Sequence, residues 1–225
     1  YCILLFLFLT WISTIFVKKT KDILKKDATS LLSTVLKPAV LGILLSCFLM
    51  QLSHGPFYAF FAIYLTENSY STNAIGIIWS LGVIAEILIF MKISSWIPKY
   101  GLKNLFVISF LFAVFRWLLI SLFPQNLAIV ILATLFHAIT YGMYHAVSIS
   151  LIHEYFTGIL QGRGQALYSS VSFGLGGSLG SFYSGYLWEQ VGGSTVFLYA
   201  GLFAFLGFIV SFILVKSRNK SYIKS

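Results

Sequence analysis

The chain has 225 residues, of which 59% are apolar and only 9% are charged. Soluble domains carry roughly 25% charged residues, so the composition excludes a soluble globular domain and indicates an integral membrane protein. The net charge of +9 indicates loops held at an anionic membrane face rather than a nucleic-acid partner. The two cysteines, Cys2 and Cys47, lie in apolar runs and indicate neither a disulfide framework nor a metal site.

Seven apolar runs approach the length of about 20 residues that crosses a bilayer. They cover approximately 1–17, 38–66, 74–92, 104–123, 127–152, 164–188 and 195–215. The first run ends at Lys18 and Lys19, so its positive charge comes last, as in a stop-transfer segment, rather than first, as in a signal peptide. We therefore expect 1–17 to be the end of a spanning helix that begins upstream, and the chain to be a fragment of a longer protein.

The basic residues predict the orientation of these spans. Fourteen of the fifteen Lys and Arg residues lie in alternate connectors, namely 18–37, 92–103, the segment around Arg163, and the tail 216–225. The opposite connectors, 67–73, 124–126 and 189–194, contain none. By the positive-inside rule, we expect a multi-pass protein of the cell membrane, the inner membrane in a bacterium, with the linker 18–37 and the C-terminal tail 216–225 in the cytoplasm.

Six spans with short loops, residues 38–215, follow a long basic linker, which is the layout of half of a twelve-helix transporter. Polar residues recur on one face of two of these spans, and each of the two begins a group of three, as expected for inverted repeats around a midplane site. The stripes are Gln51, His54 and Tyr58, and His137, Tyr141, Tyr144 and Ser148.

Two charged residues lie deep within predicted spans. Glu86 is about 12 residues from the outer end of its helix and Arg116 about 12 from the inner end of its own, each roughly 18 Å deep. Glu86 is either half of a structural ion pair or a carboxylate that binds a proton during transport. Arg116 can hold a substrate carboxylate or act as counter-ion to Glu86, and the latter is favoured because no other acid lies inside a span.

Three histidines also lie within spans. His54 and His137, each flanked by polar or aromatic residues, are candidates for proton coupling, and hydrogen-bonded packing is the alternative. His145 lies nearer the cytoplasmic end. Trp79 is seven residues before Glu86, on nearly the same face, and is either a stacking partner for an aromatic substrate or a packing residue.

Two features concern the packing of the helices. Gly55-Pro56 is expected to break its helix immediately after His54. A stripe of small residues, four apart, is expected to let another helix approach closely. It consists of Ser172, Gly176, Gly180 and Ser184.

The chain resembles the major facilitator superfamily and, within it, the 3-phenylpropionate permease group. The residues that carry the resemblance are Gln51-x-x-His54-x-x-x-Tyr58, Trp79-Ser-Leu-Gly-Val-Ile-Ala-Glu86, Arg116-Trp117, and His137 with His145. The superfamily's Gly-x-x-x-Asp loop signature is absent from 92–103. The resemblance implies an all-α membrane protein in which the last six of seven transmembrane helices form the C-terminal bundle of a twelve-helix, proton-coupled symporter.

The function expected is secondary active transport by alternating access. The substrate is a small organic solute, 3-phenylpropionate or a related aromatic carboxylate, which moves with protons. The partners are the lipid bilayer and an N-terminal six-helix bundle. Proton coupling is assigned to Glu86, His54 and His137, and substrate binding to Gln51, Tyr58, Trp79, Arg116 and Tyr141. No enzyme signature or cofactor motif occurs. The alternatives are a seven-helix receptor and an inactive truncated transporter fragment.

Overall fold

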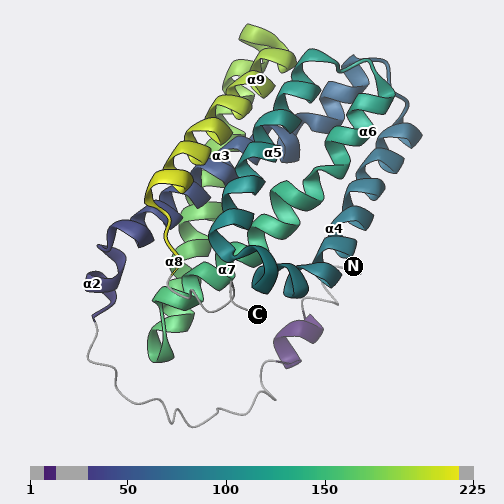
Figure 1. The fold of residues 1–225 in the computed structure, drawn as a ribbon. Helices are drawn as coiled ribbons and strands as arrows, with labels where there is room; N and C mark the ends of the chain where they lie inside the picture. The colour runs from purple at the N-terminus through teal and green to yellow at the C-terminus, as the bar shows by residue number, and fades with distance from the viewer. Residues whose placement is uncertain (1–7, 14–29, 218–225) are drawn as a thin grey trace.

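The computed structural model describes residues 8–13 and 30–217, and every regular element within these ranges is helical (Figure 1). The expected all-α class is therefore confirmed. Residues 8–13 are helical, and the labelled elements follow as α2 (Leu31–Val35), α3 (Pro38–Glu67), α4 (Thr72–Tyr100), α5 (Leu102–Leu122), α6 (Leu127–Leu135), the π-helix η1 (Ala138–Met143), α7 (Tyr144–Tyr155), the 3₁₀ turn η2 (Gly158–Leu160), α8 (Gln161–Ser169), the π-helix η3 (Ser170–Gly177) and α9 (Ser178–Leu214).

Five of the described stretches are long and apolar enough to cross a membrane. The last of them covers two of the predicted spans, 164–188 and 195–215. These two spans divide at Gly192, where φ is 78° and ψ is 156° and the helix is interrupted. The five stretches are Pro38–Glu67, Thr72–Tyr100, Leu102–Leu122, Leu127–Tyr155 and Gly158–Leu214.

The N-terminal and C-terminal predictions fall mostly on residues outside the described ranges. Of the predicted span 1–17, residues 8–13 are described, and of the predicted linker 18–37, residues 30–37, which include α2. The tail 216–225 is described only as far as residue 217.

Helix ends follow local sequence signals. Pro38 is the first residue of α3, a position where its missing N–H costs nothing. The Ser71 hydroxyl accepts from the backbone N–H of Ala74 at the start of α4, and the Asn126 side chain caps α6 in the same way. Gly101, with a φ of 78°, separates α4 from α5, and a left-handed φ of this kind favours glycine.

The predicted end of the span 74–92 is wrong, because α4 continues to Tyr100. Lys92 and Lys99, expected in a connector, lie on this helix. Hydropathy ends a run at the first lysine, but a helical lysine can extend its side chain toward the membrane surface while its backbone stays regular.

The predicted break at Gly55-Pro56 is also wrong, because α3 is continuous from Pro38 to Glu67. Pro56 lacks an N–H and so leaves the carbonyl of Leu52 without its helical donor. Gly180 of α9 lies against this oxygen, since a Cβ built on Gly180 would be 2.7 Å from it. The backbone of the neighbouring helix thus packs directly against the freed carbonyl.

The stripe of small residues packs against α3, as expected. A Cβ on Gly176 would lie 2.6 Å from the carbonyl oxygen of Phe48, and Ser172 and Ser184 are fully buried. The contact is therefore between backbones, and α3 lies directly beside α9 (Figure 1).

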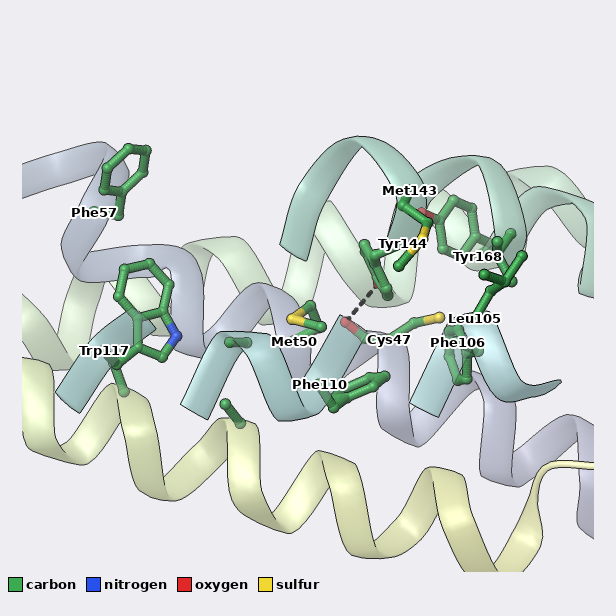
Figure 2. Close-up of a cluster of buried hydrophobic side chains, with 14 of the residues drawn as sticks. Cys47, Met50, Phe57, Leu105, Phe106, Phe110, Trp117, Met143, Tyr144 and Tyr168 are labelled. Atoms are coloured by element: carbon green, nitrogen blue, oxygen red, sulfur yellow. Dashed lines mark hydrogen bonds between the residues drawn. The ribbon is translucent and has the colours of Figure 1, made fainter. Parts of the chain in front are cut away.

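The core lies where α3 meets α5, α7 and α9. Figure 2 shows its buried side chains, among them Met50, Phe110 and Trp117, with the Tyr144 hydroxyl donating to the backbone carbonyl of Cys47 at 3.3 Å. Cys47 is a free, buried cysteine whose thiol donates to the Ser148 hydroxyl at 3.6 Å.

Candidate functional site: a buried arginine between two histidines

The site is centred on Arg116 of α5, whose side chain is fully buried. Its Nη1 lies 3.2 Å from His54 Nε2 and 3.2 Å from His137 Nδ1, and donates to the Thr140 hydroxyl at 3.0 Å. His54 lies on α3, His137 is the last residue before η1, and Thr140 lies on η1. The arginine therefore joins three helices through one nitrogen.

Aromatic rings enclose the guanidinium. Its carbon lies 4.1 Å from the ring centroid of Phe57 and 4.3 Å from that of Trp117. Trp117 is itself fixed, because its indole N–H donates to the Ser53 hydroxyl at 3.3 Å. Contacts of this kind stabilise a desolvated cation by about 2 kcal/mol or more.

The hydrogen-bonding capacity of arginine determines the tautomers of both histidines. A guanidinium has only donors, so we assign the ring nitrogens that face it, His54 Nε2 and His137 Nδ1, as acceptors. The two hydrogens of Nη1 are shared among these two nitrogens and the Thr140 hydroxyl. The remaining protons of the neutral rings then lie on His54 Nδ1 and His137 Nε2. His54 Nδ1 is 2.9 Å from the Met50 carbonyl oxygen, which accepts that proton, whereas the N–H of His137 points toward α4.

Glu86 of α4 lies on that side of His137. Its Oε2 is 3.6 Å from His137 Nε2, and the Glu86 side chain is 18% exposed. Gly142 makes room for it, since a Cβ there would be 2.9 Å from Glu86 Cγ. Among the described residues Glu86 and Arg116 do not form a direct ion pair, because His137 lies between the two charges; the expected counter-ion role would therefore act through His137.

Arg116 therefore has unused donors. No carboxylate of the described residues forms an ion pair with it, and its Nε and Nη2 find no acceptor among the described protein atoms. A buried guanidinium in this state is costly unless an anion completes it.

The π-helix η1 positions the second half of the site. π-Helical turns are rare and occur frequently at functional sites. Here the wide turn directs Thr140 to Arg116, while Gly142 receives Glu86. Gly82 brings α4 close on the same side, since a Cβ there would be 3.0 Å from Thr134 Cγ2.

A hollow of about 520 Å³ lies in front of the two histidines. Tyr58 and Tyr141, with ring centroids 5.9 Å apart, belong to its lining. Behind them His137 stacks on Tyr141 at 5.0 Å, and His54 lies 6.2 Å from Tyr58. The full lining is Gln51, Gly55, Tyr58, Tyr141, Phe173, Gly177, Ser178 and Ser181.

The structure thus places seven of the eight predicted site residues in or beside this centre. The exception is Trp79, which packs on Phe57 at 4.5 Å and on Phe61 at 5.9 Å and is not part of the hollow's lining. His145 lies one step further along, stacked on Tyr141 and 2.9 Å from the Tyr168 hydroxyl.

Sequence reasoning missed Thr140 and Phe57, the residues that contact the guanidinium beside the histidines. Neither carries a charge or breaks a pattern, so no signal singles them out in an apolar span. Within residues 8–13 and 30–217, no group of three His, Cys, Asp or Glu side chains could hold a metal ion.

Comparison with known proteins gives a consistent result. Residues 1–199 match the model of the "MFS_1 like family". The chain is 30% identical over 148 residues to the "Probable 3-phenylpropionic acid transporter" of Escherichia coli K12, which covers 64% of this chain and 38% of that protein. It is 24% identical over 205 residues to the "Uncharacterized transporter YwbF" of Bacillus subtilis 168, which covers 91% of this chain and 50% of that protein. The chain thus spans half or less of the length of these curated relatives, and it belongs to the MFS_1-like family of major facilitator superfamily transporters.

Proposed function

We propose that the protein is a secondary active transporter that carries a small organic anion, an aromatic carboxylate, together with a proton. The observation that carries the proposal is Arg116, a fully buried guanidinium whose Nε and Nη2 have no acceptor among the described residues. Carboxylates bind guanidinium groups through two parallel hydrogen bonds, so a substrate carboxylate would supply the missing anion.

The surroundings of Arg116 support an aromatic substrate. Phe57 and Trp117 already flank the guanidinium, and Tyr58, Tyr141 and Phe173 line the hollow. Aromatic side chains prefer edge-to-face or offset contacts with other rings. One curated relative is named as a 3-phenylpropionic acid transporter, a molecule that combines one ring with one carboxylate.

Substrate would reach Arg116 from the hollow, past Tyr58 and Tyr141. Tyr58 is 47% exposed, whereas the histidines behind it are buried. Gln51 lines the same hollow, and its amide Nε2 has no acceptor among the described residues, so it can contribute a donor to the substrate.

Glu86 is the proposed proton carrier. His137 Nε2–H faces the carboxylate and can donate to it when it is ionised, while Arg116 occupies the other ring nitrogen. His137 would then contact both the anion-binding Arg116 and the proton-binding Glu86, and His54 would contact Arg116 from α3. These roles retain the predicted coupling set of Glu86, His54 and His137.

We further propose that this bundle is the C-terminal half of a twelve-helix protein and moves against an N-terminal bundle by alternating access, with the C-terminus in the cytoplasm. Support comes from the greater length of the curated relatives. Cysteines introduced at the exposed positions Ser71 and Ser194 should react with an impermeant reagent from outside, and one at Ser30 only after permeabilisation. Labelling of Ser30 in intact cells would reverse the orientation.

The test of the function is uptake of labelled 3-phenylpropionate by the full-length protein in proteoliposomes with an imposed pH gradient. Arg116→Lys should lower uptake about tenfold or more, because lysine keeps the charge but loses the planar fork. Arg163→Lys, on the exposed start of α8, is the matched control and should retain it. 3-Phenylpropanol, which lacks the carboxylate, should compete poorly. Equal competition by the alcohol would show that the site does not bind an anion.

Membership of a transporter family favours this function over the seven-helix receptor suggested as an alternative by the number of predicted spans.

A further inference from the structure

Two hollows adjoin where α4 ends and α5 begins, away from the site around Arg116. They share Tyr100 and Ile108 and are otherwise lined differently. The first, about 410 Å³, is lined by Lys99, Tyr100, Lys103, Asn104, Val107, Ile108 and Phe212. The second, about 290 Å³, is lined by Trp96, Tyr100, Leu105, Ile108, Ile139 and Met143.

The first hollow is cationic, and its two lysines are held in place. Lys103 Nζ donates to the Phe212 carbonyl at 2.9 Å and lies 5.7 Å from the Phe212 ring. That carbonyl belongs to the last turn of α9, where backbone oxygens lack helical donors. Lys99 Nζ lies 5.1 Å from the Tyr100 ring. No acidic residue lines this hollow, so two ammonium groups are available to an anion.

The second hollow is lined mainly by apolar side chains. Ile108 and Tyr100, which both hollows share, are 41% and 43% exposed. Trp96 and Tyr100 lie one helical turn apart, and such aromatic residues concentrate at the level of the lipid headgroups. A cationic hollow therefore adjoins an apolar one, beside an aromatic pair of the kind found at the level of the headgroups.

The ends of α4 and α9 and the start of α5 lie at the same end of the bundle (Figure 1). Lysines near a membrane surface attract anionic lipids. A water-soluble phosphate compound would use the lysines but would gain nothing from Trp96, Leu105 and Ile139.

We propose that these hollows bind one molecule of anionic phospholipid. Its phosphate lies between Lys99 and Lys103, and an acyl chain lies in the apolar hollow against Ile139 and Met143. These last two residues belong to η1, whose Thr140 and Gly142 contact Arg116 and Glu86. The lipid thus packs on the outer side of the same π-helix that forms the candidate site.

The test is lipid retention by the full-length protein, purified in mild detergent and incubated with phosphatidylglycerol or phosphatidylcholine, with native mass spectrometry as the readout. We expect preferential retention of phosphatidylglycerol, reduced about fivefold by Lys99→Gln and about fivefold by Lys103→Gln. Lys92→Gln, an exposed lysine of α4 outside both hollows, is the matched control and should have no effect.

Ile139→Trp fills the apolar hollow without changing any charge and should also reduce phosphatidylglycerol retention. Excess inorganic phosphate should not displace the lipid, whereas displacement would indicate a simple anion site. Equal retention of the two lipids, or an equal loss in Lys92→Gln, would overturn the proposal. Size-exclusion profiles of each variant establish that the protein remains folded. Because Lys99 is exposed, Lys99→Gln should not disturb the packing of the helices.

Discussion

Helices α3 and α4 are neighbours in sequence and similar in length, but they meet different surroundings. The apolar segment of α3 has a mean hydropathy of 1.5, and 78% of it is buried. The apolar segment of α4 has a mean hydropathy of 2.3, and only 17% of it is buried. The less hydrophobic helix is the one that protein covers, because lipid offers no hydrogen-bond partner to a polar side chain. Gln51, Ser53 and His54 are buried in α3.

Glu86 is the exception on α4, which is mostly exposed in this bundle. It is tolerated because Gly142 leaves space for its side chain and His137 faces its carboxylate. The polar side chains of α3 are thus buried by the packing of whole helices, whereas Glu86 on α4 depends on its local contacts with Gly142 and His137.

The largest expected effect is at the contact of α3 with α9. Gly55→Ala would place a Cβ against the backbone of Gly180, which cannot move aside as a side chain can. We expect a loss of about 3 kcal/mol or more in stability, measured by the amount of folded protein and its thermal unfolding. Gly76→Ala on α4 is the control, since nothing lies within 4 Å of its added Cβ. Equal behaviour of the two variants would contradict the packing of α3 on α9.

A second pair compares two methionines. Met50 of α3 is fully buried and Met91 of α4 is 73% exposed. Met50→Ala should cost about 2 kcal/mol or more because it leaves a cavity, and Met91→Ala should change the unfolding temperature little, since most of this side chain is exposed. A larger loss at Met91 would mean that this face of α4 is covered by protein.

Glu86→Gln removes the negative charge of Glu86 on α4. The amide keeps the shape of the protonated acid but cannot release a proton. We expect proton-driven accumulation to fall about tenfold, equivalent to about 1.4 kcal/mol, while substrate exchange without a gradient is retained. A parallel loss in both assays would assign Glu86 a structural role instead.

Gly142→Ala should have the smallest effect. The new Cβ would press on Glu86 Cγ, which is part of a flexible side chain, so the carboxylate moves rather than the backbone. We expect a fewfold decrease in proton-driven accumulation with normal folding, and no further decrease when it is combined with Glu86→Gln. Additive losses would show that Gly142 acts independently of Glu86.

Much of this organisation could be predicted from the sequence. Hydropathy located the long apolar helices of residues 30–217, apart from the end of the span 74–92, and the stripe from Ser172 to Ser184 correctly indicated a close helix contact. The surroundings of Pro56 could not be predicted, because Gly180, which packs against the freed carbonyl of Leu52, lies 124 positions after Pro56 in the sequence.

The site was predicted by residue type but not by pairing. Depth in the membrane placed Glu86 and Arg116 at similar levels, and depth alone cannot show which side chain lies between them. His137, the last residue before the π-helix η1, occupies that position, and a π-helical turn has no clear sequence signature. Thr140 contacts Arg116 from η1 and Phe57 contacts it from α3, so both contacts depend on how separate helices pack.

The arrangement of Arg116, His137 and Glu86 has an electrical consequence. With Glu86 ionised and no substrate present, the negative charge of Glu86 balances the positive charge of Arg116. With a substrate carboxylate on Arg116 and a proton on Glu86, the centre is again neutral. Binding of either ligand alone leaves one uncompensated charge in a region of low dielectric constant, which costs several kcal/mol. Under the proposed function, the two neutral states are the ones suited to reorientation, so we expect transport to be electroneutral and to respond to the pH gradient rather than to the membrane potential.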